Sequence, residues 1–379
     1  MNVTAHAERL PSGTLGLQVE RSAQPWPDLL GFGLRENPRR GFLFVSRVLG
    51  KHLPVSPRVI ADSWTTLAGQ LPPDLPGPVL FVGLAETATA LGEGVARAYA
   101  ARTGRLDWTF LHSTRYATRH PVAVRFEEPH SHATAHLIHT PHAEVGAAHF
   151  AGARTLVLID DELSTGTTLT NLGRAYLDLN PGVERVVLVS LTDWCGDRAR
   201  IGGVLERPVE SVSLLRGAYT FTPAADWAPP ALPAVVGDGG DKTALLAEVG
   251  PRYGTAPLTP DARFGRALTQ LKALPRSTRL LVLGTGEFQY LPILLAFHVE
   301  HQRPDLQVRA SATTRSPILP WGAIGHKRTF RDNYADDIPN YVYNVPDGAY
   351  DHIVLAYEGY AAPDPALVHA LNATPLQLA

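Results

Sequence analysis

The chain of 379 residues is 45% hydrophobic and 18% charged, and 34 Lys and Arg against 36 Asp and Glu give a formal charge of −2. This length predicts two domains, each able to bury its own core, and the near-neutral charge disfavours nucleic acid or an anionic membrane as a partner. The single cysteine, Cys195, excludes an internal disulfide, and no apolar run approaches the ~20 residues that span a bilayer. The N-terminal residues lack the apolar segment of a secretory signal, so we expect a soluble, cytoplasmic protein.

Proline and glycine divide the chain most strongly between residues 222 and 260. Such a segment cannot form a continuous helix or a central strand, because proline lacks the amide donor and restricts the residue before it. We therefore predict an N-terminal extension at 1–30, a first domain at 31–221, a linker at 222–260 and a second domain at 261–379.

Short apolar runs rich in β-branched residues alternate with helical periodicity in both halves, as in βαβ units. In the first half we expect strands at 79–82, 108–111, 155–159, 185–191 and 212–215, with helices at 87–102 and 168–179. In the second half we expect helices at 262–274 and 290–301 and strands at 279–283, 307–312 and 352–356. The predicted fold class is α/β, with a mostly parallel sheet in the first domain and a second, smaller α/β domain.

The segment 155–168 carries the strongest chemical signal. Its apolar strand ends in two adjacent carboxylates, Asp160 and Asp161, and an amphipathic helix follows. The connection consists of small and hydroxylic residues, among them Ser164, Thr165, Gly166, Thr167 and Thr168. Free amides at a helix N-terminus bind anions, and parallel sheets bind ligands beyond the carboxyl ends of their strands. A sugar with a terminal phosphate suits both features, whereas the alternative is an ordinary strand-to-helix connection with a capped helix.

This pattern resembles the type I phosphoribosyltransferases. The resemblance implies that Asp160 and Asp161 hold the ribose hydroxyls of phosphoribosyl pyrophosphate (PRPP), that the loop holds its 5-phosphate, and that Mg²⁺ takes part beside the two acids. The turn of Leu84, Ala85, Glu86 and Thr87 resembles the loop under the pyrophosphate in that family, where backbone amides would bind because Glu86 itself repels a diphosphate. Arg115, after the strand at 108–111, is a candidate phosphate ligand. The alternatives are a tight glycine turn and a surface arginine.

Eight of the fifteen histidines fall between His112 and His149. Their spacings match neither a zinc finger nor a helical His-Glu-x-x-His site, which disfavours a metal site. In the resembling family this region is a mobile hood over the substrate, so Glu127, Glu128, His130 and His132 are read as hood residues. Glu128 and His130 are the candidates for an acid or base toward the acceptor, and the alternative is a solvated loop.

A second resemblance concerns Thr313-Thr314-Arg315-Ser316-Pro317, which is similar to the TRSP domain. That domain accompanies a phosphoribosyltransferase-like domain in bacterial proteins linked to tellurite-resistance and stress gene clusters, and segments 37–54 and 128–132 also look like that subgroup. The resemblance implies a cytoplasmic enzyme that helps to make a nucleoside-like metabolite.

The two halves share a spacing, because Gly83 precedes Thr114 by 31 residues and Gly284 precedes Thr314 by 30. We hypothesise that the second domain is a degenerate copy in which Ala356 and Tyr357 replace the two aspartates; the alternative is a chance likeness, and different strand orders would contradict the hypothesis. Gly284, Gly286 and Arg315 are expected to line one pocket. Arg315 is expected either to bind a phosphate or to pair with an acid, for which the candidates are Asp332, Asp336 and Asp337.

The function that these resemblances imply is a PRPP- and Mg²⁺-dependent transfer of the phosphoribosyl group to a nitrogenous acceptor with release of pyrophosphate. The alternative is a non-catalytic protein that senses PRPP or a nucleotide in the same pocket. The partners expected are small molecules only, PRPP and the acceptor, while the oligomeric state stays open with a homodimer as one alternative.

Overall fold

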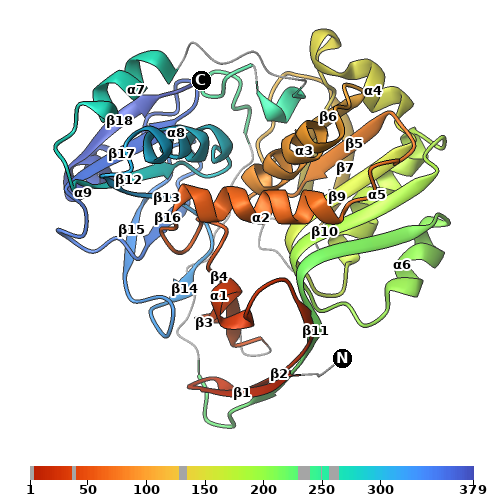
Figure 1. Ribbon diagram of the computed structural model, residues 1–379, viewed down its shortest axis with the longest axis horizontal. Helices are drawn as coiled ribbons and strands as arrows, with labels where there is room; N and C mark the ends of the chain where they lie inside the picture. The colour runs from red at the N-terminus through yellow and green to blue at the C-terminus, as the bar shows by residue number, and fades with distance from the viewer. Residues whose placement is uncertain (1–3, 36–39, 128–134, 229–239, 249, 256–263) are drawn as a thin grey trace.

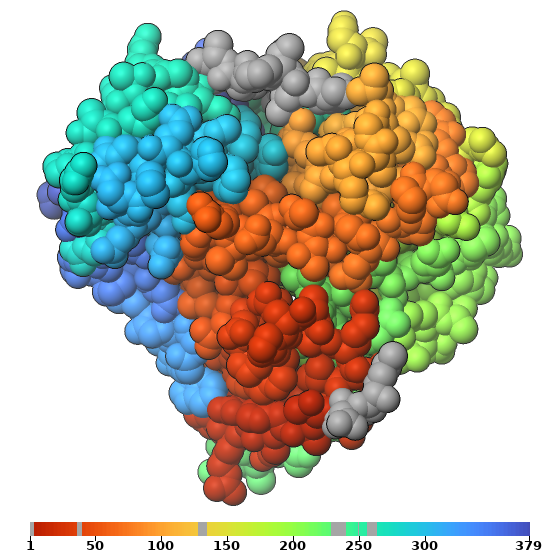
Figure 2. Space-filling view, viewed as in Figure 1, coloured from red at the N-terminus to blue at the C-terminus, as the bar shows by residue number. Residues whose placement is uncertain are grey.

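The computed structural model describes residues 4–35, 40–127, 135–228, 240–248, 250–255 and 264–379 (Figure 1). Two lobes lie side by side, each built around its own sheet, and helix α2 (Pro57–Gln70) lies between them. The N-terminal strands form a third part below α2, coloured red in Figure 2. Within the described ranges, no helix is both long and apolar enough to cross a membrane.

The sheet of the first lobe confirms the expected mostly parallel arrangement. Its seven strands follow the order β1-β2-β11-β10-β9-β5-β6. The parallel strands are β5 (Val79–Gly83), β6 (Trp108–His112), β9 (Thr155–Leu163), β10 (Arg185–Asp193) and β11 (Val209–Pro223). Numbered along the chain, these five run 2-1-3-4-5 across the sheet, a doubly wound order whose direction reverses between β5 and β9.

Helices cover both faces of this sheet. Helices α2 and α3 (Thr89–Thr103) pack on one face, and α5 (Thr167–Leu179) and α6 (Arg198–Leu205) on the other. Alternate strand residues divide accordingly, since Phe81 belongs to the hydrophobic cluster on the α3 side and its neighbours Leu80 and Val82 to the cluster on the α5 side. A parallel strand buried on both faces reads as a continuous apolar run, which is why these strands were predictable.

The sheet of the second lobe has four parallel strands in the order β13-β12-β17-β18. They are β12 (Arg279–Gly284), β13 (Gln307–Ala312), β17 (His352–Tyr357) and β18 (Ala373–Gln377), with helices α7 (Phe264–Lys272), α8 (Tyr290–Gln302) and α9 (Pro365–Leu371). In chain order this is 2-1-3-4, the same as the first four strands of the first lobe. The strand-order difference that would have contradicted the copy hypothesis is therefore absent from these two sheets.

Each lobe also carries an antiparallel hairpin between its second and third strands. In the first lobe it is β7 (Val122–Glu127) with β8 (Ala135–His139), and in the second it is β15 (Lys327–Arg331) with β16 (Pro339–Tyr343). Each hairpin bonds to the loop after the second strand: Leu137 pairs with Thr114, and Tyr341 pairs with Thr314. The correspondence between the lobes thus extends beyond their sheets.

The N-terminal residues belong to more than one part of the fold. Strands β1 (Thr4–Leu10) and β2 (Gly13–Ser22) extend the first sheet antiparallel to β11, which explains why β11 runs to Pro223 rather than ending near 215. After the short helix α1 (Trp26–Leu29), β3 (Leu30–Arg35) and β4 (Phe42–Ser46) form a sheet with β14 (Ile318–Leu319) of the second half. Residues 4–22 are thus integrated into the first sheet.

Two extended segments, called arms below, each pair with a strand of the other lobe. Val55, just before α2, pairs antiparallel with Ala310 on β13, and Thr255, in the second half of the predicted linker, pairs with Phe110 on β6. One hydrophobic cluster also runs through both lobes and includes Trp64 of α2, whose ring lies 5.6 Å from that of Tyr290 on α8. The lobes therefore share this cluster, while each lobe also has a hydrophobic cluster of its own.

Candidate active site

Three of the predicted segments converge at one edge of the first sheet. The register pairs Gly83 with Ile159 on one side and with His112 on the other, so the residues that follow β5, β6 and β9 leave the sheet at the same level. This edge includes the point where the strand order reverses, and parallel α/β sheets bind ligands at such points. The geometry brings together Asp160, Asp161, the turn at 84–87 and the loop at 113–115.

The two aspartates lie within β9, which continues through them to Leu163. Asp160 accepts a hydrogen bond from the Asp161 amide at 2.9 Å, and both side chains are partly exposed. Burial raises the pKa of Asp161 above its ordinary value, and the charge of Glu162 adds to the shift. Glu162 is itself paired with Arg40. A carboxylate whose charge is disfavoured in the folded protein gains from a hydroxyl donor or a cation.

The predicted phosphate loop ends at the start of α5. Gly166 has a φ of +73°, and a Cβ there would lie 2.5 Å from Ile201 Cδ1, so the turn requires glycine. Helix α5 begins at Thr167; its N-cap residue, Gly166, supplies no side-chain cap, and the Thr167 amide donates to Thr165 Oγ1 at 3.4 Å. The hydroxyls of Thr165 and Thr167 lie 2.9 Å apart, and Arg200 Nη2 donates to the Thr165 carbonyl at 2.8 Å. Ser164, Thr165, Thr167 and Thr168 keep some exposure, so the loop combines an uncapped helix end with hydroxyls and a nearby guanidinium.

Two of the four backbone amides in the turn after β5 already donate hydrogen bonds within the protein and are not free to bind a ligand. The Leu84 amide donates to Ile159 O, and the Ala85 amide donates to Ser113 Oγ, both at 2.9 Å. The amides of Glu86 and Thr87 are the donors of this turn that lack a partner among the described residues. The Glu86 carboxylate is engaged with the second lobe, since Oε2 accepts from Thr314 Oγ1 at 2.9 Å and lies 3.2 Å from Lys51 Nζ. Its expected repulsion of a diphosphate is therefore partly offset.

The loop after β6 is held from two directions. Ser113 Oγ lies 3.0 Å from His136 Nδ1, and the Arg115 amide donates to Glu287 Oε1 at 3.0 Å. Thr114 Oγ1 donates to Glu287 Oε2 at 2.7 Å. Arg115 thus follows a buried loop that is tied to the hairpin of its own lobe and to the second lobe.

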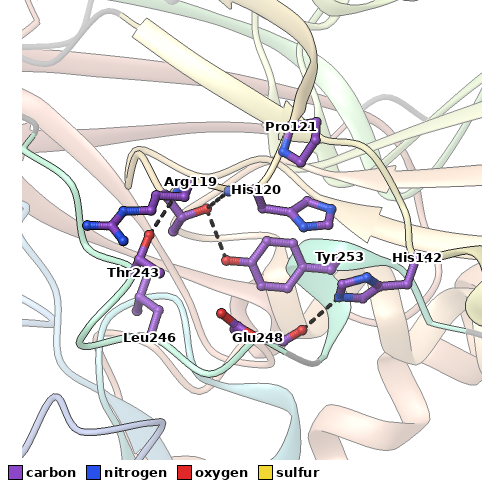
Figure 3. A pocket seen from close by; sticks show the side chains of 9 residues that line it. Arg119, His120, Pro121, His142, Thr243, Leu246, Glu248 and Tyr253 are labelled. Carbon is purple, nitrogen blue, oxygen red and sulfur yellow. Dashed lines mark hydrogen bonds between the residues drawn. The ribbon is translucent and has the colours of Figure 1, made fainter.

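The histidines have several environments. Glu128 and His130, the candidate acid and base, and His132 lie outside the described residues, and Glu127 ends β7. The rings of His120, His142 and Tyr253 lie against one another in a cavity of about 230 Å³ that residues of the first lobe line together with residues within the segment 243–253, and Figure 3 shows the two imidazoles beside the Tyr253 ring. His142 bonds to the Glu248 carbonyl at 2.8 Å. Nowhere in the described ranges do three His, Cys, Asp or Glu side chains gather as a candidate metal cluster.

The predicted residues of the second lobe lie at the equivalent edge of its sheet. Gly284 ends β12, and the Gly286 amide donates to Thr313 Oγ1 at 2.9 Å. Arg315 takes the acid-paired alternative, with Nη2 2.9 Å from Asp336 Oδ2 and its guanidinium 4.8 Å from the centre of the Tyr116 ring. A ligand at this edge stays a prediction.

The structure corrects the proposed replacement of the two acids. The register pairs Gly284 with Ala356 just as it pairs Gly83 with Ile159, so Tyr357 and Glu358, and not Ala356 and Tyr357, occupy the places of Asp160 and Asp161. The comparison by sequence was off by one residue, because no sheet register was available to align the strands. One acid is thus retained, but Arg252 closes it in an ion pair at 3.0 Å.

Sequence reasoning missed the cations that the N-terminal segment brings to this edge. Lys51, 2% exposed in its side chain, contacts Glu86, and Arg40 contacts Glu162 next to Asp161. Both contacts join residues far apart in the chain. The available signal was the density of basic residues in the stretch 37–54, which holds Arg39, Arg40, Arg47 and Lys51.

Comparisons with known proteins were consistent over the first lobe. A family model described as phosphoribosyl transferase (PRTase_2) matches residues 29–218, and a model described as the TRSP domain C-terminal to PRTase_2 matches residues 250–371. No curated protein matches the chain.

Solved structures similar to the chain include two adenine phosphoribosyltransferases and one orotate phosphoribosyltransferase. The adenine enzyme of Giardia lamblia, in complex with 9-deazaadenine, is 19% identical over 52% of this chain and 98% of its own, with a TM-score of 0.35. That of Saccharomyces cerevisiae, in complex with an imino-altritol bisphosphate and adenine, is 17% identical over 51% and 97%, with a TM-score of 0.33. The orotate enzyme of Francisella tularensis is 17% identical over 41% and 65%, with a TM-score of 0.25.

Proposed function

The chain belongs to the phosphoribosyl transferase family, with a TRSP domain following the transferase domain, and from this we propose that it transfers the phosphoribosyl group of PRPP to a nitrogenous base or base-like acceptor. The observation that carries the proposal is the juxtaposition, at the reversal point of the sheet, of Asp160 and Asp161 with an uncapped helix N-terminus. The two carboxylates suit ribose hydroxyls, and the helix N-terminus suits a monophosphate.

In this reaction the anomeric C–O bond to pyrophosphate breaks and a C–N bond to the acceptor forms, while the acceptor nitrogen loses its proton. Positive charge develops on the ribose and negative charge on the leaving diphosphate. Asp160 and Asp161 orient the ribose and face the developing cation, and residues 164–168 hold the 5-phosphate, so binding energy at a remote group fixes the anomeric carbon. The amides of Glu86 and Thr87 face the diphosphate in this arrangement.

A divalent cation fits the donor set of this edge, since Mg²⁺ favours carboxylate oxygens together with substrate phosphates. Asp160 and Asp161 are the residues that would hold it, and when bound it offsets the charge of the diphosphate. Burial and the charge of Glu162 raise the pKa of Asp161, and a cation bound there would favour its ionised form.

The finer parts of the proposal come from the resemblance. Glu128 and His130 are proposed as acid or base toward the acceptor under a closing hood. The reaction is proposed to serve a cytoplasmic, nucleoside-like pathway connected with stress or tellurite resistance. The presence of the TRSP domain supports the subgroup on which this connection rests.

The test is pyrophosphate release from PRPP with Mg²⁺ and a panel of purine and pyrimidine acceptors. We expect the wild-type chain to release pyrophosphate with at least one acceptor and the double variant Asp160→Asn with Asp161→Asn to release none. The matched control is Asp178→Asn, which changes an exposed aspartate on α5. Unchanged PRPP consumption in the double variant contradicts the assignment, and tight PRPP binding without turnover favours a sensor.

A further inference from the structure

The two lobes exchange equivalent hydrogen bonds across their interface. From the second lobe, Glu287 accepts from Thr114 Oγ1 at 2.7 Å and from the Arg115 amide at 3.0 Å. From the first lobe, Glu86 accepts from Thr314 Oγ1 at 2.9 Å and from the Arg315 amide at 3.3 Å. Glu287 and Thr314 follow Glu86 and Thr114 by 201 and 200 residues. Each glutamate therefore holds the loop after the second strand of the opposite lobe.

A buried cation stands behind each glutamate. Arg252 lies 3.0 Å from both Glu287 Oε2 and Glu358 Oε1, and all three side chains are at most 5% exposed. Lys51 lies 3.2 Å from Glu86 Oε2 in the other half of the interface. Hydrogen bonds to a charged group are stronger than neutral ones, and low exposure removes water as an alternative partner. The position of Glu287 is therefore strongly determined by Arg252.

The loop that Glu287 holds belongs to the candidate active site. Ser113 Oγ in this loop accepts the Ala85 amide, and so fixes the turn whose Glu86 and Thr87 amides face the diphosphate in the proposed reaction. Arg115 follows in the same loop. Loss of the Glu287 contacts removes the acceptor of the Thr114 hydroxyl and the acceptor of the Arg115 amide together, and both groups lie within two residues of Ser113.

We propose that the second lobe acts as a built-in partner of the transferase lobe, in which Glu287, oriented by Arg252, is a positioning residue for the PRPP site. This inference rests on the proposed function for its substrate but not for its geometry. Glu287 touches no reacting atom, and it acts through the loop 113–115. In this role the TRSP domain contributes to the transfer reaction by holding a loop of the PRPP site, a contact that the transferase domain does not supply itself.

The test is the full-length variant Glu287→Gln, which keeps the size of the side chain and removes its charge. We expect the Arg115 amide to exchange with deuterium at least ~10-fold faster, because its acceptor is weakened. We expect the KM for PRPP to rise ~10-fold while kcat falls less than ~3-fold, since the loop binds substrate in the ground state. A role limited to overall stability would lower the active fraction and leave KM unchanged.

Asp351→Asn is the control, because it removes a carboxylate from an exposed ion pair with Arg279 in the same lobe and should change neither quantity. The reciprocal variant Glu86→Gln is expected to accelerate exchange of the Arg315 amide in the second lobe. Unchanged Arg115 exchange and unchanged KM in Glu287→Gln overturn the inference. If the wild-type chain does not turn over PRPP, the proposed function fails, and the exchange of the Arg115 amide alone then supports or overturns the positioning role.

Discussion

The two lobes share a strand order, an inserted hairpin and a reciprocal interface. They differ in the exposure and pairing of the acidic residues at the equivalent strand end. In the first lobe, Asp160 and Asp161 remain partly exposed and the pKa of Asp161 is raised. In the second lobe the equivalent positions hold Tyr357 and Glu358, and Glu358 is closed by Arg252. The same strand arrangement thus supports two outcomes: two carboxylates that keep some exposure at the strand end, or one carboxylate closed in a buried ion pair.

The buried cations show the same difference. Arg252 donates to Glu287, Glu358 and Thr114, whereas Lys51 forms an ion pair with Glu86 but donates no hydrogen bond to any residue in the described part of the chain. A satisfied buried network stabilises a fold, while incompletely paired groups cost stability and are typical of functional sites. The difference between the two cations agrees with the chemistry that we propose for the first lobe and the positioning role that we propose for the second.

The largest expected effect separates the equivalent positions Asp160 and Tyr357. We expect Asp160→Asn to reduce pyrophosphate release by ~10³-fold or more, because a preorganised charge near the developing cation is lost. We expect Tyr357→Phe to retain the wild-type rate. Steady-state rates of the two variants, with circular dichroism to check folding, measure this difference; equal losses in both would remove the functional distinction between the lobes.

The next effect concerns the free energy of unfolding, for which we expect the larger change from the substitution in the second lobe. Glu358→Gln removes one charge partner of buried Arg252, and we expect it to lower the free energy of unfolding by about 3 kcal/mol. Asp161→Asn should leave it unchanged or raise it, because the folded protein disfavours the charged carboxylate. Urea unfolding curves give both values. A loss in Asp161→Asn as large as in Glu358→Gln would contradict this interpretation.

A smaller effect is a pH dependence that comes from His52, which follows Lys51 in the connection between β4 and α2. Burial lowers the pKa of His52 to about 3, and the charges of Lys51 and Arg35 add to the shift. Since the unfolded chain binds the proton near pH 6.5, this group's contribution to stability is complete above that pH and is lost as the pH falls. Between pH 7.5 and 5.5 the expected loss is about 1.4 kcal/mol.

The variant His52→Phe tests this assignment, because it keeps a ring against Tyr343 and removes the titration. Its unfolding free energy should fall less between the two pH values than that of the wild type. An identical pH slope in both proteins would show that His52 does not contribute.

The sequence predicted those parts of the fold that depend on local pattern. Buried parallel strands appear as apolar runs and the helices between them as periodic segments, so β5, β6, β9, β10 and β12 were found with their order of succession. The strands β1–β4 and both hairpins were missed because their own patterns are weak, although β1 pairs with β2, β3 with β4, and the strands of each hairpin with one another. The extension of β11 depends on β2, some 200 residues away.

The residues of the candidate site also fall into those that local pattern identifies and those that depend on distant contacts. Asp160, Asp161 and the loop 164–168 were found because they are contiguous with a strand and a helix that local pattern identifies. Glu287, Arg252 and Lys51 were not found, because their roles arise from contacts such as Glu287 to Thr114, which joins residues 173 positions apart. The spacing shared by the halves indicated a relation between them, but only the sheet register corrected the alignment that substituted Ala356 for an acid.

The crossed arms have a consequence for how such a chain is inherited. Val55 lies in the segment matched by the transferase family model but pairs with β13 of the other lobe, and Thr255 lies in the segment matched by the TRSP model but pairs with β6. The unit that a gene can lose or gain is therefore not the unit that folds. A gene that kept only the first segment would encode the arm at Val55 without strand β13, with which it pairs. It would also leave the edge of β6 without its pairing to Thr255. We accordingly expect the two segments to be retained or lost together.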